Sequence, residues 1–171
     1  MPGTMSIHQF LSEAHVPYAV LPHRPAFSAQ QEAAATHVRG RDWAKVVVCI
    51  VDDKPIEAVL PAPYMVNLDD LLALTGGKKI RLAREDEVGR LFLDCEPGAM
   101  PPLGSIYGQM VYVDVRLAAE PALVFDAGTH SEAIAMRWVD FVRTIHPIVG
   151  KFAEPRAILD GGAADFFTTR V

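Results

Sequence analysis

Two glycine-containing segments and one lysine carry the residue types that could do chemistry in this chain. Residues 96–104 read EPGAMPPLG and residues 126–130 read DAGTH, and each segment follows an apolar run. Glycine lets main-chain groups approach a ligand closely. Lys45 is the only charge at the head of the apolar run KVVVCIV. An ammonium group facing two glycine loops would form a polar pocket for an anionic or carbonyl group.

A plainer interpretation stays open for the same residues. A lysine at a strand end is usually solvated, and glycine turns are usually only turns. Motifs of other enzyme classes are missing from the sequence, since it has no GxSxG, P-loop, HExxH or GxGxxG pattern. Adjacent carboxylates occur at residues 52–53 and 69–70, where we expect a hairpin turn and the first turn of a helix.

The histidines and cysteines predict no metal site. The six histidines lack metal-ligand spacing, and the two cysteines form neither a CxxC pair nor a pattern with histidine. Cys49 reads as a buried small hydrophobe. Cys95 adjoins the first glycine segment, so a reactive thiol there is a lesser alternative. We therefore expect neither a metal nor another cofactor.

Composition predicts one cytoplasmic globular domain. The 171 residues are 50% hydrophobic, but no apolar run has the length of a membrane span, and residues 1–9 do not resemble a secretory signal. A net charge of −5 argues against non-specific nucleic-acid binding. Basic residues in segments 24–45 and 78–90 could form a local basic face or a solvated face of mixed charge.

Local patterns predict an α+β fold in which strands and short helices position these segments. Ser6 caps a helix to about His15, and a second helix runs from about Ala29 to His37 and is ended by Gly40. Further helices are expected over 68–74, 85–91 and 137–145, the last packing on the sheet. Strands are expected over 18–21, 45–51, 56–60, 78–82, 110–115, 122–125 and 133–136.

The strand over 45–51 and the strand over 56–60 should form a buried hairpin at the centre of the sheet. Residues 126–130 are expected to form a turn between two strands. The strands should be mostly antiparallel, in a mixed sheet or a partly closed barrel surrounded by short helices. We expect residues 1–153 to form the domain and residues 154–171 to be a loosely ordered C-terminal tail.

The lysine before three valines, the segment GAMPPLG and the segment AGTH together resemble the YbaK/ProRS-associated domain family, the editing domains of bacterial prolyl-tRNA synthetases and their free-standing relatives. The resemblance covers roughly residues 10–148. It implies hydrolysis, in trans, of the ester between a wrong amino acid and the terminal adenosine of a tRNA. It also implies that neither a metal nor a protein nucleophile is used, and that the vicinal ribose hydroxyl assists.

The resemblance also implies roles for individual residues. Lys45 would hold the aminoacyl-adenosine end, and Gly98 would bind the carbonyl or position water. Substrate-binding roles fall on two aromatic residues, one proline and the second glycine segment, namely Tyr18, Phe27, Pro101, Gly128, Thr129 and His130. The form AGTH departs from the GAN form common in the synthetases, so the amino acid removed stays open between alanine, cysteine, serine, threonine and others.

Two functions from different classes remain after the sequence alone. The first is a free-standing aminoacyl-tRNA deacylase that acts on mischarged tRNA, with a tRNA synthetase as a possible partner and no membrane involvement. The second is a non-catalytic module for nucleic acid or protein on the same fold, for which segments 39–45 and 78–84 could serve. The acidic net charge predicts that any tRNA binding is weak and transient.

Overall fold

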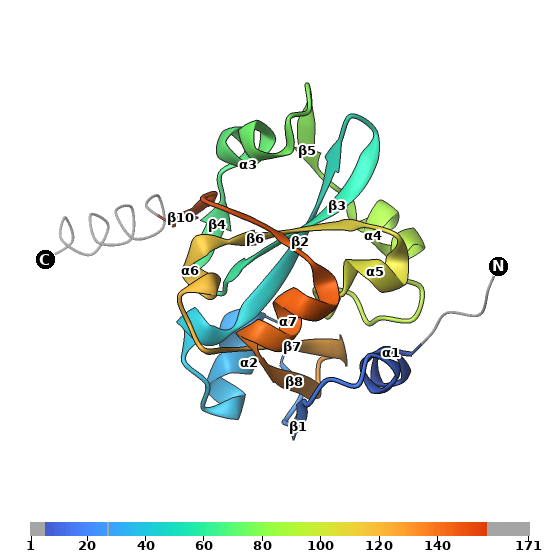
Figure 1. Ribbon diagram of the computed structural model, residues 1–171, viewed down its shortest axis with the longest axis vertical. Coiled ribbons are helices and arrows are strands. Elements are labelled where there is room, and N and C mark those ends of the chain that lie inside the picture. The colour runs from blue at the N-terminus through green and yellow to red at the C-terminus, as the bar shows by residue number, and fades with distance from the viewer. Residues whose placement is uncertain (1–5, 27, 157–171) are drawn as a thin grey trace, which may run out of the picture.

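The strands of this protein form three sheets. The computed structural model of the chain describes residues 6–26 and 28–156 (Figure 1). The largest sheet has the order β5-β2-β3-β6-β9. Its strands are β2 (Ala44–Val51), β3 (Lys54–Pro61), β5 (Ile80–Leu82), β6 (Met110–Asp114) and β9 (Ile148–Gly150). A second sheet, β1-β8-β7, comprises β1 (Ala19–Pro22), β7 (Ala122–Thr129) and β8 (Glu132–Arg137), and β4 (Tyr64–Val66) pairs with β10 (Ala153–Pro155).

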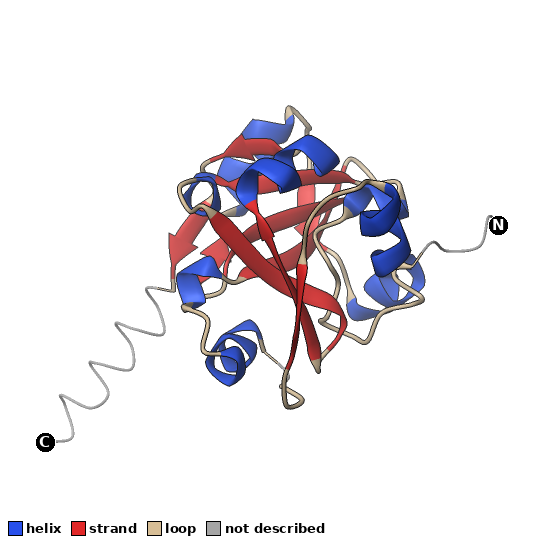
Figure 2. Ribbon diagram, turned by 60° about the horizontal axis from the view of Figure 1, so that its bottom comes forward, coloured by secondary structure: helices blue, strands red, loops and turns tan. Residues whose placement is uncertain are grey.

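Short helices lie around the outside of these strands (Figure 2). They are α1 (Ile7–Glu13), α2 (Ala29–Thr36), α3 (Leu68–Thr75), α4 (Glu85–Leu91), α5 (Gly104–Tyr107), α6 (Val115–Ala118) and α7 (Trp138–Ile145), with a 3-10 turn at Gly40–Asp42. All strand pairs are antiparallel except β3 with β6 and β6 with β9. The expected mixed, mostly antiparallel α+β fold is confirmed, and the sheets do not close into a barrel.

The hairpin of β2 and β3 occupies the middle of the largest sheet, as the sequence predicted. Its turn places Asp52 and Asp53 at φ angles of 46° and 67°. Both residues at positive φ fit the tight turn that matches the twist of antiparallel strands. The Asp52 carboxylate accepts backbone N–H bonds from Lys78 and Lys79, which lowers its pKa. The Asp52 carboxylate therefore has a structural role, because it bonds the hairpin turn to the two residues that precede β5.

Two apolar clusters hold the layers together. The larger one fills the space between the five-stranded and three-stranded sheets, and α7 closes it with Phe141 and Ile145. The other covers the opposite face of β2 and β3, where Leu71 of α3 packs with Phe152. β2 and β3 therefore have a core on both faces, which explains their continuous apolar sequences.

The structure corrects three local predictions. Helix α1 ends at Glu13, and α2 ends at Thr36 because His37 adopts a left-handed conformation with φ 59°, well before Gly40. The expected turn over residues 126–130 is mostly strand, since β7 continues to Thr129 with an irregular register. Strand β10 includes residues 154 and 155, residues 157–171 lie outside the described residues, and the expected C-terminal tail stays a prediction. Across residues 6–26 and 28–156, no helix is long and apolar enough to cross a lipid bilayer.

Glu57 on the central strand β3 is a buried carboxyl group. Neither of its oxygens has a hydrogen-bond partner in the described part of the chain, and its exposed fraction is 0%. Burial disfavours the charged form, so the pKa of Glu57 lies well above its usual range. The folded protein therefore keeps Glu57 neutral at pH values where the unfolded chain ionises it.

This imbalance predicts a pH-dependent stability that a Glu57→Gln variant lacks. The stabilising contribution of the raised pKa is complete below the ordinary glutamate pKa and falls as pH rises toward the folded-state value. Each unit of pKa elevation corresponds to about 1.4 kcal/mol. When the pH is raised from 5 to 8, denaturant unfolding should show a larger decrease in the free energy of unfolding for the wild type than for Glu57→Gln. Parallel losses in the two proteins would show that Glu57 does not titrate in this way.

Candidate functional site

The first glycine segment forms a tight turn. The Ala99 N–H group donates to the Glu96 carbonyl at 3.0 Å, which closes a four-residue turn over residues 96–99. Pro97 occupies its second position and Gly98 its third, where Gly98 has φ +83°. A type II turn has this arrangement, and its third position favours glycine because φ is positive there. Proline and glycine thus determine the backbone shape of this segment.

The second glycine segment is the irregular end of β7. The pairing with β8 passes from Asp126 opposite Ala133 to Thr129 opposite Glu132, which leaves two residues unmatched. Gly128 lies there with φ +91°, and a Cβ atom on it would approach the Ile7 Cδ1 atom to 3.2 Å. Gly128 therefore allows both the strand irregularity and the close packing of α1.

Hydrogen bonds join these two segments. The Glu96 N–H group donates to the Gly128 carbonyl at 2.8 Å, and the Gly128 N–H group donates to the Ala99 carbonyl at 3.0 Å. The His130 N–H group donates to Glu96 Oε2 at 2.8 Å. The turn over residues 96–99 is therefore bound to the end of β7 by main-chain and side-chain contacts.

The His130 side chain adds a contact that orients the turn. Its ring is buried, its Nδ1 atom lies 3.0 Å from Glu32 Oε1, and its Nε2 atom contacts the Pro97 carbonyl oxygen. A carbonyl only accepts, so Nε2 carries the proton of that bond. The C=O and N–H groups of a trans peptide point in opposite directions, and the described chain has no cis peptide. The Gly98 N–H group therefore points away from His130.

Gly98 lies at a pocket on the other side of the turn. The described residues provide no hydrogen-bond acceptor for its N–H group, and Gly98 is exposed. The pocket has a volume of about 690 Å³. Its apolar lining comes from Ala83, Val88, Phe92, Leu93 and Met100, and the acidic residues at it are Glu85, Asp86 and Glu96. Gly98, whose N–H group has no acceptor in the described chain, is thus one of the residues that line a mainly apolar space large enough for a small organic group.

None of the other residues that the resemblance pointed to is among the described residues that line the pocket, and their substrate-binding roles stay predictions. Pro101 and Gly128 are buried, Thr129 is half-buried, and the Thr129 hydroxyl lies 3.4 Å from that of Ser131. Tyr18 packs at the edge of the larger core, and its hydroxyl lies 3.2 Å from His8 Nδ1. Phe27 lies outside the described residues, so its predicted role stays a prediction.

Lys45 has a different setting from the glycine segments. It lies in β2 opposite Leu60, and its side chain is half-buried. Burial, and to a smaller extent the positive charge of Arg156, lowers its pKa to about 8. Lys45 is thus a partly desolvated cation beside a second cation, which is a setting that favours an anionic ligand.

Strand alternation separates the Lys45 side chain from the turn. Successive side chains of a strand point to opposite faces, so Lys45 shares a face with Val47. Val46 and Val48, on the other face, belong to one apolar cluster with Met100, which follows the turn. The structure therefore brings the two glycine segments together and places Lys45 across the sheet from them.

Two alternatives raised by the sequence lose support. Burial raises the pKa of the Cys95 thiol to about 12, so a reactive thiolate is disfavoured. The basic segment over residues 78–90 is ion-paired, with Arg81 bound to Glu87 and Arg90 bound to Asp86. This segment is a face of mixed charge, the plainer of its two interpretations.

Sequence reasoning missed a pair of buried acids behind His130. Glu32 of α2 and Asp126 of β7 share a hydrogen bond between their carboxyl groups, and both are buried. Burial raises the pKa of both, and the neighbouring Glu32 raises that of Asp126 further. The sequence indicates only carboxylates that are neighbours along the chain. Glu32 and Asp126 are far apart in the sequence and meet only through the packing of α2 against β7.

Solved structures share this fold. The hypothetical protein APE2540 superposes with a TM-score of 0.79 at 18% identity, covering 86% of this chain and 99% of its own. A candidate trans-editing enzyme for prolyl-tRNA synthetase superposes with a TM-score of 0.75 at 19% identity, covering 90% of this chain and 98% of its own. A candidate signal transduction protein from Marinobacter aquaeolei VT8 gives a TM-score of 0.70 at 19% identity, covering 96% of this chain and 34% of its own.

These likenesses define the class of fold, a mixed α+β domain shared with a trans-editing candidate. The chain belongs to the aminoacyl-tRNA editing domain family, whose model matches residues 23–144. The matched range contains Lys45, the turn over residues 96–99 and the end of β7. No curated protein sequence matches the chain significantly.

The joined segments predict that Glu96 holds the turn in place. In a Glu96→Ala variant the His130 N–H group loses its acceptor, a hydrogen bond worth about 1–2 kcal/mol. Hydrogen exchange followed by mass spectrometry or NMR should show faster exchange at the Ala99 and Gly128 amides. Glu85→Ala, an exposed glutamate at the same pocket, should leave both rates unchanged. Equal protection in both variants would mean that the Glu96 carboxylate does not hold the turn.

Proposed function

We propose that this protein is a trans-acting editing enzyme that hydrolyses the ester bond of mischarged aminoacyl-tRNA. Its family membership supports this function, and so does its fold, shared with a candidate trans-editing enzyme for prolyl-tRNA synthetase. The observation that carries the proposal is the Gly98 N–H group, which lacks an acceptor in the described chain and belongs to a residue that lines a pocket. Such a donor is what an ester carbonyl needs when it becomes an oxyanion.

The reaction follows from this donor. Water attacks the ester carbonyl carbon, and the negative charge that develops on the carbonyl oxygen is stabilised by the Gly98 N–H group. The bond between that carbon and the ribose oxygen then breaks, the ribose oxygen takes a proton, and the free amino acid leaves. The vicinal ribose hydroxyl assists by positioning the water or moving its proton. One well-placed backbone donor contributes roughly 10²–10³ in rate.

The pocket and its charges suit a small aminoacyl group. The apolar walls formed by Val88 and Phe92 would contact a short side chain, and the Glu96 carboxylate lies at the same pocket as a partner for the α-ammonium group. Alanine is the first candidate for the amino acid, followed by cysteine, serine and threonine. The pocket itself does not select among them, because small side chains differ little in the apolar area they bury.

Lys45 is proposed to bind the tRNA end. Its partly buried ammonium group has a lowered pKa near a second cation, Arg156. A phosphate placed there would relieve the repulsion between the two cations and restore the charge on Lys45. In this proposal Lys45 contacts a phosphate of the acceptor end on its own face of β2, while the turn over residues 96–99 contacts the ester on the other face.

The proposal requires weak binding of tRNA. The net charge is −5, and the arginines at residues 81 and 90 are already paired with acids. The loss of counterions from phosphate contacts would thus be small, and binding should be transient. A tRNA synthetase that delivers or selects the mischarged tRNA is the partner that fits this weakness, and the cytoplasm is where both would be met.

A deacylation screen tests the enzymatic proposal. Wild-type protein is incubated with tRNAs charged with alanine, cysteine, serine or threonine, beginning with mischarged tRNA-Pro, and loss of the ester is followed with a labelled amino acid. If every ester survives, the protein is not a deacylase, and binding measured in the same samples then supports the non-catalytic module.

A matched glycine pair locates the activity. Gly98 and Gly108 both have positive φ, at +83° and +67°, so alanine strains the backbone at both positions by about 1–2 kcal/mol. Gly98→Ala should shift the donor and lower kcat by roughly tenfold to a hundredfold, because a displacement of about 1 Å has that effect. Gly108→Ala should keep the wild-type kcat. Equal kcat values for both variants would place the oxyanion donor elsewhere.

A lysine pair tests the binding role. Lys45→Ala should raise KM for aminoacyl-tRNA by about tenfold, since a phosphate contact is worth about 1–2 kcal/mol, and leave kcat within a few fold. Lys151→Ala, which removes an exposed lysine, should change neither constant. A fall in kcat without a change in KM for Lys45→Ala would move Lys45 from binding to the chemical step.

A further inference from the structure

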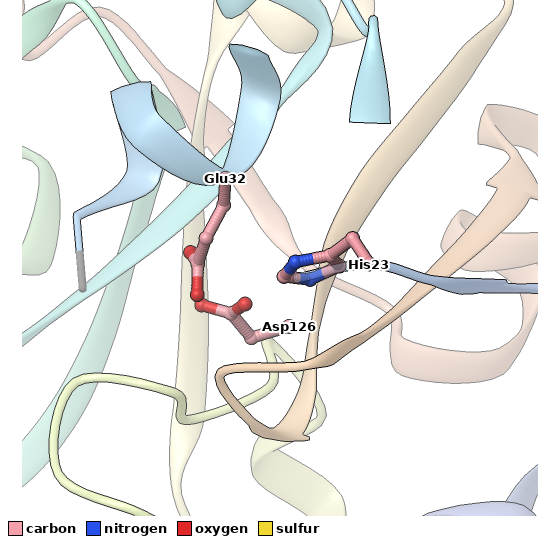
Figure 3. A group of neighbouring side chains, drawn as sticks. All are labelled: His23, Glu32 and Asp126. Carbon is pink, nitrogen blue, oxygen red and sulfur yellow. The ribbon is translucent and has the colours of Figure 1, made fainter. Parts of the chain in front are cut away.

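A second group of side chains lies behind the turn, on the far side of His130 from the pocket. His23, Glu32 and Asp126 come from the segment after β1, from α2 and from β7. One ligand atom from each lies within 4.8 Å of the other two. Figure 3 shows the carboxyl groups of Glu32 and Asp126 meeting, with the His23 ring turned toward them. Asp126 lies more than ninety residues from His23 and Glu32 in the sequence, and spacing therefore predicted no metal site.

The His23 ring is prepared to act as a ligand. Its Nδ1 atom lies 2.8 Å from the Arg24 carbonyl oxygen, so Nδ1 carries the proton and donates it. The lone pair of a neutral ring is then on Nε2, which is buried and has no hydrogen-bond partner in the described part of the chain. The Trp43 ring and the imidazole form an edge-to-face pair, which helps to hold the imidazole in its orientation. A carbonyl on the other ring nitrogen is the usual outer partner of a metal-binding histidine.

Asp126 also has a buried polar atom that a bound cation would satisfy. Its exposed fraction is 6%, and its Oδ1 atom is buried and finds no N–H or hydroxyl donor in the described part of the chain. Burying such an atom without a partner costs free energy. A cation between Asp126 Oδ1 and His23 Nε2 would satisfy both atoms at once.

We propose that His23 Nε2, Glu32 and Asp126 bind a divalent transition-metal ion, with Zn²⁺ as the best match. One imidazole nitrogen and two carboxylates are ligand types that zinc accepts, at distances of about 2.0–2.2 Å. Three protein ligands leave a fourth position for water. The ligand atoms lie close enough that modest side-chain movements bring them to those distances around one ion.

The proposed ion would also affect the turn over residues 96–99, through Glu32 and His130. Glu32 Oε1 lies 3.0 Å from His130 Nδ1, and His130 contacts the Pro97 carbonyl. An ion bound to Glu32 would restrict that carboxylate and, through it, the histidine that orients the turn over residues 96–99. The metal site lies beyond the proposed function and does not depend on it.

Zinc retention by the full chain tests this site. Protein stripped with a chelator is dialysed against Zn²⁺ and then against metal-free buffer, and bound metal is measured by mass spectrometry. We expect one Zn²⁺ per chain and a rise in Tm of about 5–10 °C at a hundredfold excess of Zn²⁺ over its Kd. Mg²⁺ at the same concentration should give no shift, because it prefers an octahedral all-oxygen site.

Variants separate this site from adventitious binding. Asp126→Asn and His23→Gln should each lose the retained zinc and the shift in Tm, while circular dichroism shows that they fold. His8→Gln alters a surface histidine paired with Glu132, and Cys95→Ser removes the half-buried thiol, and both should retain zinc. Failure of the wild type to retain zinc would overturn the proposal and leave Glu32 and Asp126 as a carboxyl pair sharing one proton. Equal retention by Asp126→Asn and wild type would overturn it as well.

Discussion

The hydrogen bond from the His130 ring to the Pro97 carbonyl is the interaction on which the candidate site depends. It sets the direction of the peptide plane between Pro97 and Gly98, and so directs the Gly98 N–H group away from His130. The neighbouring residues hold this peptide in the same orientation. Pro97 and Gly98 shape the turn, and the Glu96 carboxylate accepts a hydrogen bond from the His130 N–H group. The irregular register at the end of β7 lets the His130 ring contact the Pro97 carbonyl. A site built from main-chain donors needs this support, because no side-chain rotamer can compensate for a misdirected amide.

Local patterns predicted much of the fold. The β-branched residues before Asp52 and Asp53 predicted the central hairpin, and Ser6 predicted the start of α1, because strand propensity, turn residues and helix caps act over a few residues. Helix α2 ends within one residue of its predicted end, but His37 in a left-handed conformation ends it and not Gly40. The prediction of a turn over residues 126–130 was also wrong. Glycine can interrupt the register of a strand without ending the strand.

The candidate site was only partly predictable. The two glycine segments were chosen from their composition and from the family resemblance, but their mutual hydrogen bonds join elements far apart in the sequence. Position along the chain also suggested that Lys45 lies beside them, whereas strand alternation turns its side chain to the other face of β2. Glu32 and Asp126 were missed because a buried carboxyl pair has no local signature. Each acid taken alone resembles an ordinary surface residue.

The larger apolar cluster has a consequence for how the protein matures. It lies between the five-stranded and three-stranded sheets, so the turn over residues 96–99 and the strand that holds it become neighbours only when the sheets have packed against each other. Contacts between distant parts of the chain pay their loop-closure entropy before they contribute stability. The turn would therefore take its final direction together with the finished core, and the candidate site would be complete only in the fully folded chain.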